Sequence, residues 1–269
     1  MSFASIKTEG IVLSSAPSRE ADRIYRVCTK DYGKLSVQGR GALKAGAKLA
    51  SHLESIGRVK LEVVRGRHST TVIGVEFMEL YPLLRADIER RLTAQTALAL
   101  LNRYVDDEEH DPVLYELLVN WLRYLNDTPE FTPAQLLLSL TSFVYKLMDH
   151  LGYQVQLRQC LSCANTILPF AFRWHGGKGG LVCTGCAQRD SREWFAAVRV
   201  PEEVISLMHI LTEDAYTDVL RLSLTKPVIE SLARMAHDFM MSHLPGRERA
   251  PFWEGLLIHI DLERPTHSL

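Results

Sequence analysis

The first 80 residues carry short apolar runs separated by turn-forming residues, a pattern that predicts β-strands. Lys30–Gly33 joins the second run to the third and has the composition of a hairpin turn. A stretch rich in Gly, Ala and Lys, residues 39–53, separates the third run from the fourth. The apolar runs lie at residues 10–13, 23–28, 34–37, 56–64 and 69–80. Five strands with a gap after the third match the layout of a small barrel of the OB type.

From Pro82 onward, apolar residues recur at helical spacing. Asp111 and Thr132 stand where they can cap the second and third of the predicted helices. The acidic run Asp106–Glu109 separates the first two helices and is most simply read as a solvated loop. The helices are predicted over residues 83–105, 113–125, 133–151, 201–211 and 226–244. The fold class is therefore α+β, with an N-terminal OB-fold β-barrel followed by an α-helical domain.

Four cysteines interrupt the helical pattern with the most specific chemical signal in the chain. They form two Cys-x-x-Cys pairs, Cys160 with Cys163 and Cys183 with Cys186, separated by 19 residues. Structural zinc sites with four cysteine ligands space their pairs by about 15–20 residues. Such a site is closed, because sulfur fills all four positions, and it supports folding rather than catalysis. We therefore predict an inserted four-cysteine zinc module that holds a structural Zn²⁺ ion.

Glycines around the cysteines fit this interpretation. Those between Gly176 and Gly180 allow the intervening loop to reverse, and Gly185, inside the second pair, is expected at a positive φ. A thiol-redox pair, two disulfides or simply buried cysteines are the alternatives. A redox motif uses a single Cys-x-x-Cys, and disulfides require export. The fifth cysteine, Cys28, lies in an alternating apolar run and is expected in the core.

The composition is that of an ordinary soluble protein, with 46% hydrophobic and 23% charged residues among 269. The start of the chain has no long apolar run, and no stretch is long enough to span a membrane, so we expect a cytoplasmic protein. The net charge of -1 is unevenly distributed. Residues 1–80 carry +5, residues 81–160 carry -4 and residues 161–269 carry -2. A basic front end on an otherwise acidic chain suggests a polyanionic partner.

Basic residues of the predicted barrel are candidates for contact with nucleic acid. Tyr25 and Tyr32 lie among them, and on a small barrel such a surface can offer cations to phosphates and rings to bases. The alternative for each cation is ordinary solvated charge, which also applies to Arg189, Arg192 and Arg199 after the cysteines. The candidate DNA-binding residues are Arg19, Arg23, Lys34, Arg40, Lys44, Lys48, Arg65 and Arg67.

No catalytic motif is present in the sequence. It contains no P-loop, no G-x-S-x-G and no H-E-x-x-H. Its ten histidines are scattered, and four cysteines complete the predicted metal site without His175. We therefore expect a protein that is not an enzyme.

Several segments together resemble the family of the bacterial recombination mediator RecO. In the front domain they are residues 9–13, 20–23, 29–36 and 39–44, with sequences EGIVL, EADR, TKDYGKLS and GRGALK. Farther on they are residues 81–87, 151–153 and 179–183, with sequences YPLLRAD, LGY and GGLVC. The resemblance extends over nearly the whole chain. One departure is Ala164, which stands where a Gly commonly follows the second cysteine.

The resemblance implies an OB-fold domain at residues 1–80 and a helical domain at residues 81–158 and 191–269, with the zinc module inserted at residues 159–190. It implies a nucleoid-associated protein of the RecFOR repair pathway that binds single- and double-stranded DNA and anneals complementary strands. It also implies association with RecR, contact with the single-strand-binding protein, and assistance to RecA loading.

Two other functions remain as alternatives at this point. One is an OB-fold RNA-binding protein of ribosome or tRNA metabolism. The other is an enzyme, either a metal-dependent nuclease or a thiol-redox enzyme, for which the sequence offers neither an open metal site nor a carboxylate cluster.

Overall fold

The computed structural model describes residues 5–19, 21–44, 48–67, 69–168, 171–213, 215–219, 222 and 224–244. The chain divides into two compact units, Met1–Pro129 and Glu130–Leu269. Each unit has its own hydrophobic core. None of the described helices is long and apolar enough to cross a membrane.

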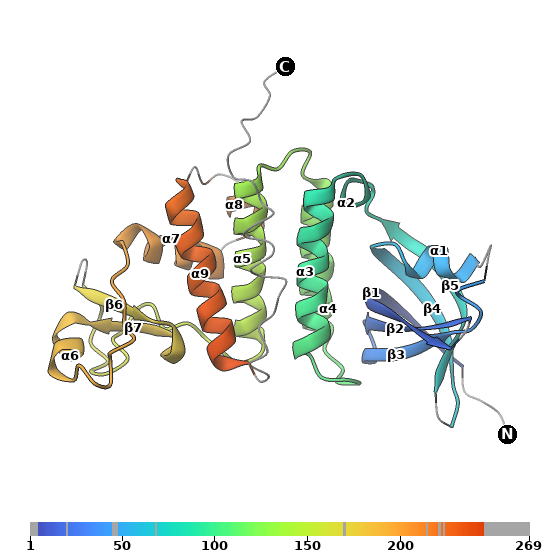
Figure 1. Cartoon of the computed structure of the whole chain (residues 1–269), viewed down its shortest axis with the longest axis horizontal. Coiled ribbons are helices and arrows are strands. Elements are labelled where there is room, and N and C mark those ends of the chain that lie inside the picture. The colour runs from blue at the N-terminus through green and yellow to red at the C-terminus, as the bar shows by residue number, and fades with distance from the viewer. Residues whose placement is uncertain are drawn as a thin grey trace, which may run out of the picture. The chain divides into compact units, whose positions relative to one another are not determined.

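The first unit begins with a closed five-stranded barrel whose strands follow one another in the order β1-β2-β3-β5-β4. Neighbouring strands are antiparallel, except that β3 and β5 pair in parallel. The strands are β1 (Ser5–Arg19), β2 (Asp22–Thr29), β3 (Gly33–Gly39), β4 (Gly57–Arg65) and β5 (Thr70–Leu80) (Figure 1). This topology is that of an OB-fold, so the predicted fold of the front domain is confirmed.

Alternation along the strands builds the barrel interior. On β2, Tyr25 and Val27 are fully buried, whereas Ile24 and Arg26, which alternate with them along the strand, face outward. Valine and leucine side chains of β3 and β4 join them in one core cluster. The predicted hairpin turn at residues 30–33 connects β2 to β3, and Gly33 adopts a positive φ of 64° there.

A short helix, α1 (Lys48–Leu53), lies in the Gly/Ala/Lys-rich segment between β3 and β4 and packs against β5. Its last residue, Leu53, is fully buried in the barrel core. This helix was not predicted, because six residues are too short to display a helical period.

Three helices complete the first unit: α2 (Pro82–Ala86), α3 (Ile88–Tyr104) and α4 (Pro112–Asp127). The single helix predicted from residue 83 to 105 is interrupted at Asp87, whose side chain accepts hydrogen bonds from the backbone N–H groups of Glu89 and Arg90. Asp111 caps α4 as predicted, accepting from Leu114 N at 2.8 Å. Because α3 packs on β1, these helices belong to the same compact unit as the barrel.

The second unit is built on α5 (Pro133–His150) and α9 (Lys226–His243), which lie side by side (Figure 1). Thr132 and Gln135 form a capping box at the start of α5, as the sequence pattern predicts for Thr132. The helices α7 (Glu202–Glu213) and α8 (Tyr216–Val219) pack against α5.

Between α5 and α7 the chain forms a small insert that carries the four cysteines. It contains β6 (Phe172–His175), the 3₁₀ turn η1 (Gly176–Lys178), β7 (Gly180–Cys183) and α6 (Thr184–Arg189). The strands β6 and β7 form a two-stranded antiparallel sheet, and η1 contacts α9. A helical domain with an inserted four-cysteine module is thus the observed arrangement. The last predicted helix, residues 226–244, corresponds to α9, which ends at His243.

Candidate metal centre and nucleic-acid interface

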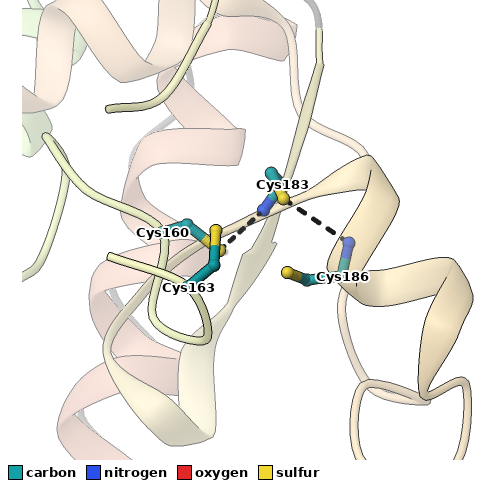
Figure 2. Close-up of side chains that lie close together, drawn as sticks. All are labelled: Cys160, Cys163, Cys183 and Cys186. Atoms are coloured by element: carbon teal, nitrogen blue, oxygen red, sulfur yellow. Dashed lines mark hydrogen bonds between the residues drawn. The ribbon is translucent and has the colours of Figure 1, made fainter. Parts of the chain in front are cut away.

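The four cysteines converge on one point at the end of the insert. Cys160 and Cys163 come from a tight turn, Cys183 ends β7, and Cys186 lies in α6 (Figure 2). Their sulfur atoms all lie within 4.8 Å of one another. Around a tetrahedral ion with metal–sulfur bonds of about 2.3 Å, sulfurs lie about 3.8 Å apart. Small side-chain rotations therefore suffice to close this cluster around a metal.

Backbone N–H groups donate to two of the sulfurs, Cys160 Sγ and Cys183 Sγ, and they favour the thiolate form of Cys160. Cys183 N donates to Cys160 Sγ at 3.3 Å, and Cys186 N donates to Cys183 Sγ at 3.4 Å. Ser162 N also donates to Cys160 Sγ. Burial would raise the pKa of Cys160, but these N–H groups outweigh it, so its pKa lies below the usual range of a thiol. Metal ligation needs this form of the side chain.

The first cysteine turn contains a residue in an unusual backbone conformation. Ala164 has a φ of 57°, and its N–H donates to Cys160 O at 2.9 Å, which closes the turn. Glycine would adopt this left-handed conformation without steric cost. The departure from the family pattern at this position therefore leaves the turn in place.

The expectation for Gly185 was wrong. It lies in α6, where Cys183 is the N-cap, and it is not among the glycines with positive φ. The second cysteine pair turns through a helix N-terminus, which needs no left-handed residue. Of the glycines before β7, Gly179 does adopt a positive φ, 67°, and a Cβ there would lie 2.6 Å from the Phe239 ring. This close contact packs the insert against α9.

A small core of its own supports the cysteine cluster. Val182 and Trp194 are buried in it together with Cys160 and Cys186. His175 stands edge-on to Trp194, and its Nδ1 accepts a hydrogen bond from Lys178 N at 3.1 Å. His175 therefore stabilises η1 and is not part of the cysteine cluster, as predicted.

The donor set fits a closed structural metal site, because four sulfurs leave no position for water or substrate. Among the described residues, these cysteines form the one group that could hold a metal ion. Cys28, by contrast, is buried in the first unit, where burial raises the pKa of its thiol to about 12. It is an inert core residue, as predicted.

A groove runs across the outer face of the barrel, over β2, β3 and the loop from β4 to β5. Its volume is about 590 Å³. Most of the lining side chains are hydroxyl-bearing or amide groups, and Arg65 and Glu108 are the charged ones. The groove is lined by Ser18, Ile24, Ser36, Gln38, Arg65, Gly66, Ser69, Thr70 and Glu108. OB-folds bind oligonucleotides at this face and at these loops.

Four of the candidate DNA-binding residues lie at this groove or on the chain segments beside it. Arg65 lines it, and Arg67 is exposed in the loop that follows. Arg40 and Lys44 are exposed on the turn after β3, two and six residues beyond the groove residue Gln38. That turn is tied to the β1–β2 connection, because Leu43 N donates to the backbone carbonyl of Ala21.

Two other candidate DNA-binding residues, Lys34 and Arg23, already form hydrogen bonds and ion pairs within the first unit. Lys34 is buried, and its ammonium donates to the carbonyls of Asn102 and Val105 and pairs with Asp107 at 3.0 Å. Arg23 pairs with Glu54 at 2.7 Å. It lies in a separate cavity beside α1. The side chains of Arg19 and Lys48 lie outside the described residues.

Tyr25 was expected to offer its ring on the nucleic-acid-binding surface. This prediction was wrong, because the Tyr25 side chain is fully buried inside the barrel. The Tyr32 ring is packed against the barrel core and lies 5.9 Å from the guanidinium of Arg65. Sequence reasoning also missed the polar groove residues Ser36 and Gln38. Alternation of inward and outward residues along the middle of β2 and the second half of β3 was the signal that could have identified them, since it places residues 24, 36 and 38 outward.

Two family descriptions match consecutive parts of the chain. The family description "Recombination protein O N terminal" matches residues 1–81, and "Recombination protein O C terminal" matches residues 85–250. A "DNA repair protein RecO" from Geobacter metallireducens is 31% identical over 184 residues, which cover 68% of this chain and 73% of that protein.

More distant relatives extend the match over most of the chain. A "DNA repair protein RecO" from Dehalococcoides mccartyi is 23% identical over 256 residues, 95% of this chain and 97% of its own length. One from Exiguobacterium sibiricum is 26% identical over 240 residues, 89% of this chain and 92% of its own. The chain belongs to the RecO family of recombination proteins.

Proposed function

We propose that this protein is a DNA-binding recombination mediator that acts in DNA repair and is not an enzyme. It binds single- and double-stranded DNA, anneals complementary strands and, together with RecR and in contact with the single-strand-binding protein, assists the loading of RecA. Family membership supports the role in repair. The observation that carries the DNA-binding part is the polar groove on the face of the barrel that OB-folds use for oligonucleotides.

The chemistry of the groove supports contact with the DNA backbone rather than with the bases. Its described lining residues include no aromatic ring, so a stacking platform for bases is not among them. Hydroxyl and amide groups and the Arg65 guanidinium are suited to phosphate and sugar oxygens instead. Binding of this kind leaves the Watson–Crick edges of a strand accessible, which strand annealing requires.

The residues proposed for phosphate contact are therefore Arg65 and Arg67 in the loop after β4, and Arg40 and Lys44 in the turn after β3. Arg65 lines the groove, and the other three are exposed on segments adjacent in sequence to groove residues. The ion pair of Arg65 with Glu108 is long, at 3.7 Å. Lys34 is left out of this surface, because its ammonium is already used inside the unit.

We also propose that Zn²⁺ is the ion held by Cys160, Cys163, Cys183 and Cys186. All-thiolate, four-coordinate sites are typical of structural zinc. The bound ion supplies a crosslink between the cysteine turn and the start of α6. The backbone N–H groups and the small core around Trp194 hold the sulfurs in place for the ion.

Fluorescence anisotropy with a labelled single-stranded oligonucleotide across a salt series tests the DNA-binding proposal. Replacing both Arg65 and Arg67 by Gln removes two phosphate contacts, so affinity is expected to fall for every sequence alike. The slope of log K against log salt is expected to flatten by about 1.4. The control is Lys60→Gln, because Lys60 is exposed on β4 and lies away from the groove. Equal effects of the double variant and the control would contradict the proposal.

Competition between DNA and RNA strands of the same sequence separates the mediator from an RNA-binding protein. A DNA-binding mediator retains the labelled DNA when equimolar RNA is added. Preferential displacement by RNA would instead favour the ribosome or tRNA alternative.

A further inference from the structure

The side chains of the loop between α3 and α4, Asp106–Glu109, are exposed, as expected for an acidic run, but the backbone of this loop is held against the barrel. We refer to it as the acidic loop. Its backbone is bonded to β3, since Glu108 N donates to Lys34 O at 3.0 Å and Asp107 forms a parallel bridge with Lys34. A Cβ at Gly33 would lie 2.0 Å from Glu109 O, so only glycine allows this approach. The acidic loop is thus held against the barrel by close backbone contacts.

An open strand edge explains why the acidic loop lies there. The strand β5 pairs with β3 only at Val37 and Gln38, so the part of β3 near Lys34 has no strand partner on that side among the described residues. Unpaired N–H and C=O groups at a sheet edge are commonly covered by a loop. Covering this edge brings four consecutive acidic residues next to the groove.

The two central carboxylates of the acidic loop have different settings. Asp107 accepts from Arg26 Nη1 at 2.6 Å and pairs with Lys34, whose ammonium is buried. Burial would raise the pKa of Asp107, but the hydrogen bonds from Lys34 and Arg26 outweigh it and lower the pKa. Asp107 is therefore a fixed anchor of the acidic loop.

Glu108, in contrast, stands in the groove itself. Its side chain is 64% exposed, lines the groove, and lies 3.7 Å from the Arg65 guanidinium. The backbone of Glu108 has a φ of 61°, a left-handed conformation that residues with a side chain rarely adopt. The anchors at Asp107 and Gly33 hold this conformation, and they thereby present the Glu108 carboxylate to Arg65.

We propose that Glu108 competes with nucleic-acid phosphates for Arg65, so that the acidic loop weakens DNA binding at the groove. The inference rests on the proposed function of the groove. An exposed carboxylate–guanidinium pair contributes little energy, so a DNA strand with several phosphate contacts displaces it, whereas a single phosphate gains little by doing so. The consequence is weaker and more readily reversed binding, which suits a protein that passes a strand on.

Glu108→Gln tests the inference, because it removes the charge and keeps the side-chain size. Glu109→Gln is the matched control: it changes the net charge equally, and its exposed side chain does not line the groove. In anisotropy titrations with a labelled single-stranded oligonucleotide, Glu108→Gln is expected to bind about threefold more tightly than wild type. Glu109→Gln is expected to show a smaller gain in affinity. The salt slope should stay close to that of wild type for both variants, because Arg65 contacts one phosphate in each protein.

A double-variant comparison locates the effect. In a protein that already carries Arg65→Gln, adding Glu108→Gln is expected to change the affinity no more than Glu109→Gln does. Equal affinities of Glu108→Gln and Glu109→Gln in the protein that retains Arg65 would overturn the inference and leave the proposed function standing. Absence of DNA binding by wild type and every variant, all folded by circular dichroism, would overturn both.

Discussion

Two buried cations, Lys34 and Arg90, cap the C-termini of helices in the first compact unit by donating hydrogen bonds to backbone carbonyls. The Lys34 ammonium donates to carbonyls at the end of α3, and the Arg90 guanidinium donates to Leu125 O at 3.0 Å and Thr128 O at the end of α4. The last carbonyls of a helix have no partner within the helix and carry partial negative charge. These two residues therefore stabilise the unit, although one of them was expected to bind DNA.

Lys34→Met is expected to lower the free energy of unfolding by about 1–3 kcal/mol, because it leaves two partly buried carbonyls without the ammonium donor. Equilibrium urea unfolding of the full chain measures the change. Lys44→Met, at an exposed position, is the control and should stay within about 0.5 kcal/mol of wild type. Unchanged stability of the Lys34 variant, with weakened DNA binding, would show that Lys34 does contact DNA.

The backbone conformations of Ala164 and Gly185 predict that two opposite substitutions, alanine to glycine at residue 164 and glycine to alanine at residue 185, both stabilise the protein. Ala164→Gly relieves a left-handed alanine and is expected to stabilise the metal-bound protein by about 0.5–1 kcal/mol. Gly185→Ala places alanine in a helix, with no atom within 4 Å of the new Cβ, and is also expected to stabilise by up to about 1 kcal/mol. Thermal unfolding in excess zinc measures both. Destabilisation by Gly185→Ala would restore the expectation of a positive φ there.

At the scale of the elements, the long periodic segments were predictable and the short ones were not. The strands of the barrel form distinct apolar runs between turn residues, and α4, α5 and α9 carry long apolar stripes, so these patterns identified them. The elements α1, β6, β7 and α6 have four to six residues each, too few to show a period. The break between α2 and α3 depends on side-chain capping by Asp87 inside an apolar pattern that continues through it.

The two candidate sites also differ in how well the sequence predicts them. Ligand spacing within the chain was enough to predict the cysteine cluster, because tight turns bring each pair together. The groove depends on which cations already have a partner, and those partners lie far along the chain: Asp107 for Arg26, and Asn102 for Lys34. Composition alone could not distinguish an ammonium that ends a helix from a guanidinium exposed at the groove.

We expect the whole insert to depend on a bound metal for its folding. Cys160→Ser is expected to abolish zinc binding and to unfold the insert, because its core around Trp194 is small. Zinc content measured by a colorimetric assay should fall from one per chain to nearly none, and tryptophan emission should shift to longer wavelength.

The control for the metal prediction is Cys28→Ala, which removes a buried thiol of the other unit and should keep the metal. Limited proteolysis of the Cys160 variant is expected to cut first between residues 159 and 190. A Cys160→Ser protein that resists protease there, without metal, would show that the insert folds by itself.

At the scale of the whole molecule, the barrel and the helices α2 to α4 form one compact unit that ends at Pro129. The family boundary near residue 81 falls inside this unit, where the barrel ends. Lys34 and Arg26 of the barrel have their partners in residues 102–107, so a barrel cut after residue 80 loses them. The family boundary and the boundary of the compact unit therefore differ in this chain.

A fragment of residues 1–129 is expected to unfold cooperatively in urea, whereas a fragment of residues 1–80 should unfold at a clearly lower midpoint. The reason is that the shorter fragment leaves the Lys34 ammonium without its carbonyl partners. Circular dichroism at increasing urea concentration measures both midpoints. Equal midpoints would mean that the barrel alone is the folding unit.

The measurement that tests the whole account most directly is the annealing of two complementary oligonucleotides by the purified full chain. We predict that wild-type protein accelerates annealing over a control without protein, that the acceleration declines as salt rises, and that the strands remain intact. The variant with Arg65 and Arg67 both replaced by Gln should accelerate annealing less at each salt concentration. An annealing rate equal to that without protein at every salt concentration, or strands shortened by cleavage, would contradict the account.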